Sequence, residues 1–586
     1  MKRSLFELVL LVSVVTLGGC AVTSRGDSAT TLIQIQDIST GALATRPAVA
    51  EIDGKPALLF AAKDGRVTFQ IGEKRQQIDG SARVQGGSRF QLRTQDHNVH
   101  ATWWSHESGK NLYFTTTADR GLSFSPVVAV NDDHGVLPPY SLIQGPAGVV
   151  GITYSDERLP NYQVYFNRSL NYGRTWATPD QRLDAPPPGG RSSAVQEPQS
   201  IEAGSVWLSA WTDSVQTAGQ ASYRIVSRRS LDHGVTWTQP DVLYSADHNI
   251  SSLMVKSSGN GIVIAADELN HGIFTLISTN QGESWRATGI LPGTESASNS
   301  GIDLTLLDGR GYLVWMQDRK EEKTKIMRAS VQFDQAKWTG PVQRLDQKSN
   351  DNTRSLSPVI AATKQGSLVA AWVDYRDIRP NIYMSASYDG GQVWTNPKAL
   401  NKPGSIATGW PQLIAWGDTT ALAFETYTDA DVKKGSFTVK LIPMGDATTG
   451  ISGLPNFYQP IESERKNKLE QRVKTFWSNR VAGDFSNELD MYDFYYKSTM
   501  TKKAYLDSVG TIKYNSYAIK DILIEGNVAT VKMTINYEVP PVVLPLTGQK
   551  ISTPPTEIEA SIKWVWVEDD WFQVYVAPMA QQTLQY

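Results

Sequence analysis

The stretch SLDHGVTW, from Ser230 to Trp237, places a small hydroxyl residue, an acid, a glycine and a tryptophan at fixed offsets. This pattern is typical of a tight turn between two strands. The acid accepts hydrogen bonds from nearby backbone N–H groups, and the glycine adopts backbone angles that other residues disfavour. The tryptophan supplies a large ring that can pack between neighbouring sheets. We therefore expect the stretch to be structural and Asp232 not to be catalytic.

The octet recurs along the chain with a period of roughly 50 residues, which indicates a propeller or a solenoid. Its other copies are TADRGLSF from Thr117, SLNYGRTW from Ser169, STNQGESW from Ser278 and SYDGGQVW from Ser387. A degenerate copy without the glycine, SVQFDQAKW, begins at Ser330. The octet resembles the Asp-box, S/T-x-D-x-G-x-x-W, found in sialidases and many other β-propellers. This resemblance implies that the boxes are structural and lie on the face away from the ligand.

A second pattern precedes each box: a short apolar strand, a turn, and a strand that ends in an aromatic residue and an acid. It also occurs without a box from Arg46 and from Trp410, which gives eight units between about 46 and 443. The last unit shows three strands only, and Thr31–Ser39 can supply the fourth, which would close the ring. We predict an all-β propeller of eight blades over 31–444, with seven blades as the alternative. Sialidases have six.

The N-terminus has the features of a bacterial lipoprotein leader. A basic start is followed by the apolar run LVLLVSVVTL, Leu8–Leu17, which has the length of a signal-peptide core and is too short to span a membrane. The next residues, LGGC, resemble a lipobox and end in Cys20, the only cysteine of the chain. We expect cleavage after 19, lipidation of Cys20 and a tether over 20–30. Ala21 after the cysteine favours the outer membrane, on its periplasmic or outer side.

The C-terminal part of the chain differs in composition from the repeats. Residues 445–460 are rich in Gly, Ser, Thr and Pro and are interpreted as a linker. Over 461–586, an apolar stripe of Leu469, Val473, Phe476 and Trp477 predicts an amphipathic helix. A second helical segment near 487–496 and several strands follow. Helices before a curved antiparallel sheet resemble the NTF2-like α+β fold, whose members often contain a conical pocket. Three tryptophans are expected either to form its core or to line that pocket: Trp564, Trp566 and Trp571.

Composition and motifs argue against several classes of function. A formal net charge of −3 provides no field to hold nucleic acid or an anionic membrane surface. No GxSxG, P-loop or HExxH motif occurs. The seven histidines are scattered along the sequence. We therefore predict no metal site, no cofactor and no nucleic-acid partner.

The loops between the second and third strands are expected to gather on the face opposite the Asp-boxes. Aromatic residues, acids and arginines recur in these loops, a combination that can hydrogen-bond sugar hydroxyls and stack on sugar rings. The alternative is that the acid–arginine pairs tie adjacent blades together. The candidate ligand-binding residues are Asp156, Arg158, Asp213, Asp318, Arg319, Asp374, Arg376 and Glu425.

Two functions remain open at this point. The first is a recognition or scaffolding lipoprotein of the cell envelope, which binds a glycan or a protein on this rim. The second is an exo-glycosidase of sialidase type. The resemblance implies, for an active sialidase, three arginines around the sugar carboxylate and a Tyr–Glu nucleophile. Arg158, Arg319 and Arg376 come from units three, six and seven, and Tyr427 beside Glu425 is the nearest Tyr–Glu pair. No catalytic residue is assigned from the sequence.

Overall fold

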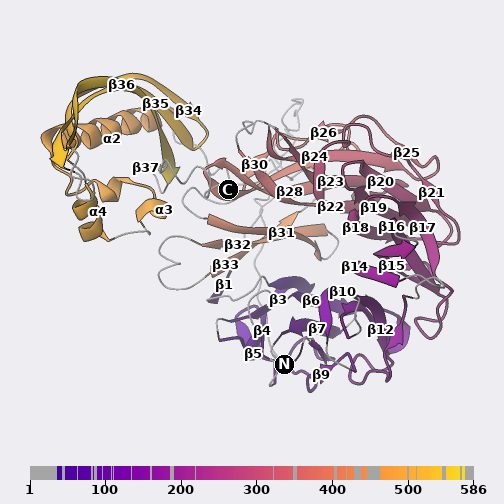
Figure 1. Ribbon diagram of the computed structural model, residues 1–586. Coiled ribbons are helices and arrows are strands. Elements are labelled where there is room, and N and C mark those ends of the chain that lie inside the picture. Colours follow the sequence, from indigo (N-terminus) through magenta and orange to yellow (C-terminus); the bar gives the residue numbers. More distant parts are fainter. Residues whose placement is uncertain are drawn as a thin grey trace, which may run out of the picture.

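The computed structural model describes 36–41, 47–444 and 462–574, apart from 63, 81–82, 85–88, 96, 107–108, 110, 133–134, 159–161, 185–190, 218–219, 321, 348–352, 364, 401–405, 417–418, 428–436, 498–500, 510, 544–549 and 568–569. The predicted leader and Cys20 lie outside these residues. Up to Met444, the described residues form eight small antiparallel sheets, arranged as in a β-propeller (Figure 1).

Each sheet is built from consecutive hairpins. The first strands are β2 (Ala48–Ile52), β6 (Phe90–Gln95), β10 (Val136–Gln144), β14 (Arg191–Ala203), β18 (Ile250–Ser258), β22 (Ser298–Leu307), β27 (Ser355–Ala362) and β31 (Ile406–Trp416). The second strands are β3 (Lys55–Ala61), β7 (Asn98–Ser105), β11 (Val150–Asp156), β15 (Val206–Thr217), β19 (Gly261–Glu268), β23 (Arg310–Arg319), β28 (Leu368–Asp377) and β32 (Thr419–Tyr427). A short 3-10 helix, η1 (Pro146–Gly148), joins β10 to β11.

Five of the third strands carry an Asp-box at their ends, and the fourth strands are mostly short. The third strands are β4 (Val67–Ile71), β8 (Asn111–Thr117), β12 (Gln163–Ser169), β16 (Gln220–Ser230), β20 (Gly272–Ser278), β24 (Glu322–Gln332), β29 (Arg379–Ser387) and β33 (Phe437–Met444). The outer strands are β5 (Lys74–Gln77), β9 (Val128–Ala129), β13 (Gln181–Arg182), β17 (Asp241–Ala246), β21 (Arg286–Ala287), β25 (Lys337–Trp338), β26 (Gln343–Arg344, also on β24) and β30 (Lys398–Ala399). Short outer strands present little free edge for aggregation.

The last sheet is completed by the N-terminal strand β1 (Gln36–Gly41), which pairs antiparallel with β33. The closing strand predicted over Thr31–Ser39 is thus present from Gln36 onward. The first and last sheets also share one apolar core, in which Val49 and Phe60 pack with Ala421 and Val439. The Gln412 side chain donates to the Pro47 carbonyl at 2.9 Å across the same junction. The sheets therefore close into a ring.

The cores between sheets are filled mainly from the second strands. The largest fully buried side chains there include Trp103, Trp207, Trp315 and Trp372. The Asp-box residue Trp237 is only half-buried and packs edge-on against Phe166, with ring centroids 5.0 Å apart. The expectation that the box tryptophan packs between sheets is correct, but the tryptophans of the second strands bury more surface.

The C-terminal unit begins with helix α2 (Glu462–Ala482), and its predicted stripe of Leu469, Val473, Phe476 and Trp477 is buried. The expected second helix is instead a 3-10 turn, η3 (Leu489–Met491), and a short helix, α3 (Phe494–Lys497). Helix α4 (Lys502–Ser508) was not predicted. A four-stranded sheet follows, of β34 (Lys513–Glu525), β35 (Val528–Val543), β36 (Lys550–Val567) and β37 (Asp570–Gln573).

The three C-terminal tryptophans belong to the core of this unit. Trp564, Trp566 and Trp571 are all buried and share one apolar cluster with α2. They therefore do not line an open pocket, and of the two alternatives the core is the one observed.

A buried ion pair connects the C-terminal unit to the propeller. Arg379 opens β29, and its guanidinium donates to Oδ1 of Asp493, just before α3. Both side chains are 4% exposed. Because an isolated buried charge is costly, separating the two residues would carry a large free-energy penalty.

None of the helices described is long and apolar enough to cross a membrane.

Candidate functional site

The Asp-box turns share one hydrogen-bond pattern. In the opening stretch, the Ser230 hydroxyl donates to Asp232 at 2.8 Å and accepts from the Gly234 N–H at 2.7 Å. Asp232 also accepts from the Thr236 backbone N–H at 2.9 Å. The equivalent contacts occur at 117–123, 169–175, 278–284 and 387–393. The acid or the asparagine at this position thus accepts hydrogen bonds from its own turn, which supports a structural role.

The acids of these turns are held ionised. Hydrogen bonds from the hydroxyls of Ser123 and Thr117 and from the Ser123 backbone lower the pKa of Asp119 to about 2. Hydrogen bonds within the turn also lower the pKa values of Asp232 and Asp389, against the opposing effect of burial. A carboxyl group with so low a pKa is a poor proton donor near neutral pH, so the boxes do not supply a catalytic acid.

The box glycines fix the distance between neighbouring sheets. Gly234 has φ +82°, and a Cβ on it would lie 2.6 Å from the Phe166 ring of the preceding sheet. Gly121 is similarly close to Phe69, and Gly173 to Phe114. The glycine is therefore required both by its backbone angle and by the ring that lies against it.

We call the face opposite the Asp-box turns the rim face; it comprises the turns between second and third strands and the connections between sheets. The antiparallel order of strands places all eight predicted ligand-binding residues at or near this face. Most of them are engaged inside the protein. Asp156 and Asp374 are fully buried and Asp213 is buried, whereas Asp318, Arg158, Arg376 and Glu425 are half-buried. Only Arg319 is exposed.

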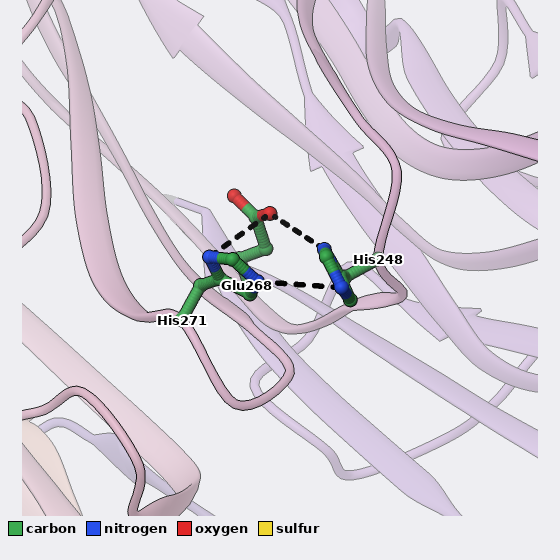
Figure 2. Close-up of side chains that lie close together, drawn as sticks. All are labelled: His248, Glu268 and His271. Atoms are coloured by element: carbon green, nitrogen blue, oxygen red, sulfur yellow. Dashed lines mark hydrogen bonds and ion pairs between the residues drawn. The ribbon is translucent and has the colours of Figure 1, made fainter.

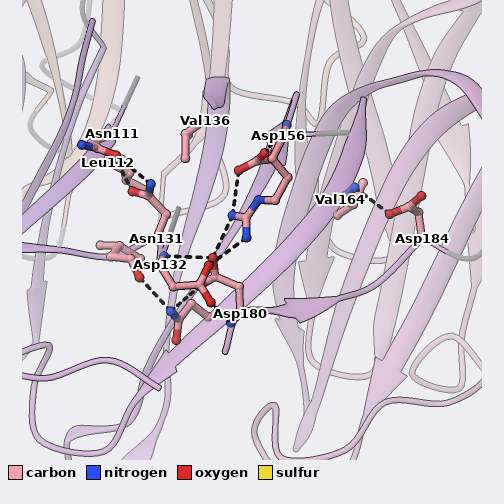
Figure 3. A network of polar contacts seen from close by, with 12 residues as sticks. Asn111, Leu112, Asn131, Asp132, Val136, Asp156, Val164, Asp180 and Asp184 are labelled. Atoms are coloured by element: carbon pink, nitrogen blue, oxygen red, sulfur yellow. Dashed lines mark hydrogen bonds and ion pairs between the residues drawn. The ribbon is translucent and has the colours of Figure 1, made fainter. Parts of the chain in front are cut away.

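Arg158 is bound by three carboxylates. Its guanidinium donates at 2.8 Å to Asp156, to Asp180 and to Asp132. Figure 3 labels these three acids. It also stacks over the Tyr165 ring, 4.1 Å from the centroid. Burial raises the pKa of Asp180 to about 6, whereas hydrogen bonding to Asp180 lowers the pKa of Asp132 to about 2. The cluster is thus a closed ionic network that fixes the connection between two sheets.

Arg376 repeats this arrangement in another sheet. It donates to both oxygens of Asp374, at 3.0 and 2.7 Å, and lies over the Tyr383 ring at 4.2 Å. Its Nη1 donates to the Gln347 carbonyl at 3.2 Å, in the connection from the preceding sheet. Trp372 donates to Asp374 as well. The paired carboxylate and the stacked tyrosine leave Arg376 little freedom to turn toward a ligand.

Asp213, Asp318 and Arg319 are also paired locally. Asp213 forms a bidentate pair with Arg224 of the adjacent strand, at 2.8 and 2.6 Å. Asp318 accepts from the Thr324 hydroxyl at 2.6 Å. Arg319 donates to Gln317 and to the Gly293 carbonyl. Glu425 lies on β32, opposite Gly409 and Val439 of its neighbouring strands.

The three arginines therefore make equivalent contacts in three different sheets. Arg158 bonds to Asp132, Arg319 to Gly293 and Arg376 to Gln347, and each of these partners lies in the connection that leads into the arginine's own sheet. Each arginine ties its turn to that connection. They do not share a partner among the described residues and do not form a common carboxylate pocket.

A second repeated signature was missed in the sequence. Each of several sheets ends in an aliphatic residue followed by a buried polar one, as at Val130–Asn131, Leu183–Asp184 and Leu345–Asp346. The backbone N–H of the aliphatic residue donates to a backbone carbonyl of the third strand. Asp184 also accepts from the Val164 N–H at 2.9 Å (Figure 3). The recurrence of QRLD at 181–184 and 343–346 is the signal that could have revealed it.

The fold also brings together side chains that are distant in the sequence. His248, Glu268 and His271 lie at the rim face, with their ligand atoms within 4.8 Å of one another (Figure 2). The histidines are scattered along the sequence, and the fold brings two of them, His248 and His271, together.

Comparison with known proteins agrees with the repeat. The model of the BNR repeat-like domain matches residues 152–353, a region that includes the boxes at Ser169, Ser230 and Ser278. A search of curated proteins finds no match.

Solved structures with some similarity include three carbohydrate-active enzymes. The polysaccharide lyase Uly1 is 10% identical, with a TM-score of 0.42, and the match covers 70% of this chain and 99% of the lyase. NanB sialidase from Streptococcus pneumoniae is 9% identical, with a TM-score of 0.34, over 72% of this chain and 95% of the sialidase. An α-L-arabinanase from Penicillium chrysogenum is 13% identical, with a TM-score of 0.34, over 53% and 96%.

Proposed function

We propose that the chain is a lipid-anchored recognition protein of the bacterial cell envelope, whose propeller binds a glycan or a protein on its rim face without hydrolysing it. The observation that carries this proposal is the equivalence of Arg158, Arg319 and Arg376 in three separate sheets. An exo-glycosidase of sialidase type requires its arginines to converge on one carboxylate. Here each of the three arginines holds a turn, which favours binding over hydrolysis by a sialidase-type triad of these residues.

The rim face keeps exposed groups that a partner can contact. Arg319 is exposed, and its guanidinium makes only two hydrogen bonds among the described residues. Tyr162 and Leu269 are 38% and 42% exposed in turns on this face. A rigid frame of buried ion pairs that presents an arginine and apolar side chains suits recognition, because little side-chain entropy is lost on binding.

Two finer structural assignments belong to the same proposal. The eight sheets act as eight blades of one closed propeller, which is supported by the pairing of β1 with β33 and by the apolar core that joins the first and last sheets. The C-terminal unit is an NTF2-like domain, supported by its helices followed by a four-stranded antiparallel sheet. The buried pair of Asp493 with Arg379 attaches this unit to the propeller.

The binding surface is tested with a soluble form of the protein that begins at Ala21. Glycan arrays and envelope-protein capture identify the ligand, and affinity is then measured for Arg319→Ala and Tyr162→Ala. We expect each change to weaken binding about tenfold, equivalent to about 1.4 kcal/mol. Matched controls are Leu231→Ser and Val393→Ser on the Asp-box face, where both side chains are 70% exposed. If the control variants lose binding and the rim variants do not, the ligand binds on the Asp-box face, and the proposal is contradicted.

The lipid anchor is tested by Cys20→Ser in a Gram-negative host. Since Cys20 is the only cysteine and the described helices include none that could cross a membrane, we expect the variant to lose its lipid label and to leave the membrane fraction. Labelling with an alkyne fatty acid, followed by fractionation, measures both. Unchanged fractionation together with an unchanged lipid band contradicts the anchor.

A further inference from the structure

The rim face contains one cluster of side chains that the proposed function does not use. His248 lies between β17 and β18, Glu268 ends β19, and His271 lies in the turn from β19 to β20. Two backbone hydrogen bonds fix this turn. The Leu269 N–H donates to the backbone carbonyl of Asn249 at 2.9 Å, and the His271 N–H donates to the backbone carbonyl of Glu268 at 2.8 Å. Because Asn249 follows His248 directly, the first of these bonds holds the two histidine-bearing loops together.

The spacing of the polar atoms is the key observation. His248 Nδ1 lies 3.4 Å from Glu268 Oε1, and His271 Nδ1 lies 4.0 Å from the same oxygen. The Nε2 atoms of the two imidazoles are 3.3 Å apart. In a tetrahedral zinc site, metal–ligand bonds of about 2.0–2.1 Å place the ligand atoms roughly 3.3 Å apart. The two Nδ1–Oε1 distances are near or somewhat above this separation and are longer than good hydrogen bonds. Because an imidazole binds one ion through only one of its nitrogens, the Nε2–Nε2 distance shows only that the two rings are adjacent. With one donor atom taken from each residue, the three donors lie within 4.8 Å of one another.

The Glu268 carboxylate is held in place by Tyr244, which bonds to the oxygen other than the one nearest the histidines. The Tyr244 hydroxyl donates to Glu268 Oε2 at 2.8 Å, which leaves Oε1 directed at both imidazoles (Figure 2). The Tyr244 ring is itself stacked on Phe274, with centroids 4.1 Å apart. Glu268 is 7% exposed, so its orientation is fixed by packing as well. Outer hydrogen bonds of this kind orient ligands in metal sites.

We propose that His248, Glu268 and His271 bind a divalent transition-metal ion, and that this ion is Zn²⁺. Two imidazoles and one carboxylate are the donor set that zinc accepts with an open coordination position, whereas Ca²⁺ and Mg²⁺ prefer sites made of oxygen ligands. Both histidine side chains are 48% exposed, so the remaining position faces solvent on the rim face. An oxyanion of a bound partner, such as a carboxylate or a phosphate, can occupy it.

The test uses metal-free, tag-free protein that begins at Ala21, which contains no cysteine. We expect isothermal titration with ZnCl₂ to show one saturable site per chain. His248→Ala and His271→Ala should each weaken zinc binding at least about 100-fold, and Tyr244→Phe about 10-fold, as outer-shell changes do. The matched control is His106→Ala, an exposed histidine in the equivalent turn of another sheet. It should bind zinc as the unaltered protein does.

Two further measurements test the coordination of the ion and its selectivity. Co²⁺ should give the visible absorption of a low-coordinate nitrogen–oxygen site, lost in both histidine variants, while the thermal melting of the metal-free variants stays unchanged. A 100-fold excess of Ca²⁺ should not displace zinc. Absence of a saturable site, equal affinity in the histidine variants and the unaltered protein, or displacement by Ca²⁺ would overturn the proposal. None of these results depends on whether the rim face binds a glycan or a protein.

Discussion

Replacing Arg158 by alanine is expected to destabilise the protein by about 3–5 kcal/mol, because it strands buried carboxylates that this arginine neutralises. Asp156 and Asp180 have fully buried side chains, and Asp132 is 21% exposed. Without the guanidinium, three acids face one another in the connection between two sheets. Equilibrium unfolding in urea measures the change in the free energy of unfolding.

The matched control for this prediction is Arg319→Ala. Its side chain is exposed and contacts a glutamine side chain and a backbone carbonyl, so the expected change is within about 0.5 kcal/mol. Arg158→Lys should fall between the two, because lysine keeps the charge and loses the planar fork that reaches several acids. If Arg158→Ala unfolds at the same urea concentration as the unaltered protein, the network is not structural.

Replacing Gly173 by alanine is the second change with a large expected effect. Gly173 has φ +80°, and a Cβ would overlap the Phe114 ring of the preceding sheet. The left-handed backbone costs about 1–2 kcal/mol for an alanine, and overpacking adds about 1–3 kcal/mol. We therefore expect a loss of about 2–5 kcal/mol in the free energy of unfolding.

Gly54→Ala separates the two contributions. Gly54 also has a positive φ, +73°, but a Cβ there would have no atom within 4 Å. This variant should show the backbone cost alone, and the difference between the two variants reports the contact with Phe114. Equal losses in both would show that the box glycine does not set the spacing of the sheets.

The Asp-boxes could be predicted because their contacts lie within eight residues of sequence. In the Ser230 box, the hydrogen bonds described for the hydroxyl, the acid and the glycine all stay within the octet: they join these residues to one another, to the octet backbone and to the Thr236 hydroxyl. The motif therefore determines its own local geometry. The closing strand β1 could be predicted because the last unit lacks a fourth strand. An exposed sheet edge has unpaired backbone groups, and the N-terminal segment can pair with them.

The role of the rim residues could not be predicted in the same way. The sequence places Asp156, Arg158, Asp374 and Arg376 correctly at one face, since strand alternation and repeat order determine this. Whether an arginine there is available to a ligand depends on partners elsewhere in the chain. Asp132 and Asp180 are 26 and 22 residues away from Arg158, and neither belongs to the recurring aromatic–acid–arginine pattern.

The cluster of His248, Glu268 and His271 could not be predicted from the sequence, for a similar physical reason. His248 and His271 are 23 residues apart, in loops on either side of a hairpin, and neither forms part of a recognised spacing. Only the turn geometry at Leu269 and the orientation of Glu268 by Tyr244 bring the three donors together. In the C-terminal unit, by contrast, the 3.6-residue period was enough to identify the buried face of α2.

The most direct test of the central claim, that the rim face binds without hydrolysing, is one measurement on the ligand after binding. The soluble form from Ala21, loaded with zinc, is incubated in molar excess over each glycan that it retains. The glycan is then analysed by mass spectrometry. We predict that the bound glycan, or a bound envelope protein and its glycans, is recovered with unchanged mass. Release of a terminal sugar by the purified protein would contradict the account and establish an exo-glycosidase.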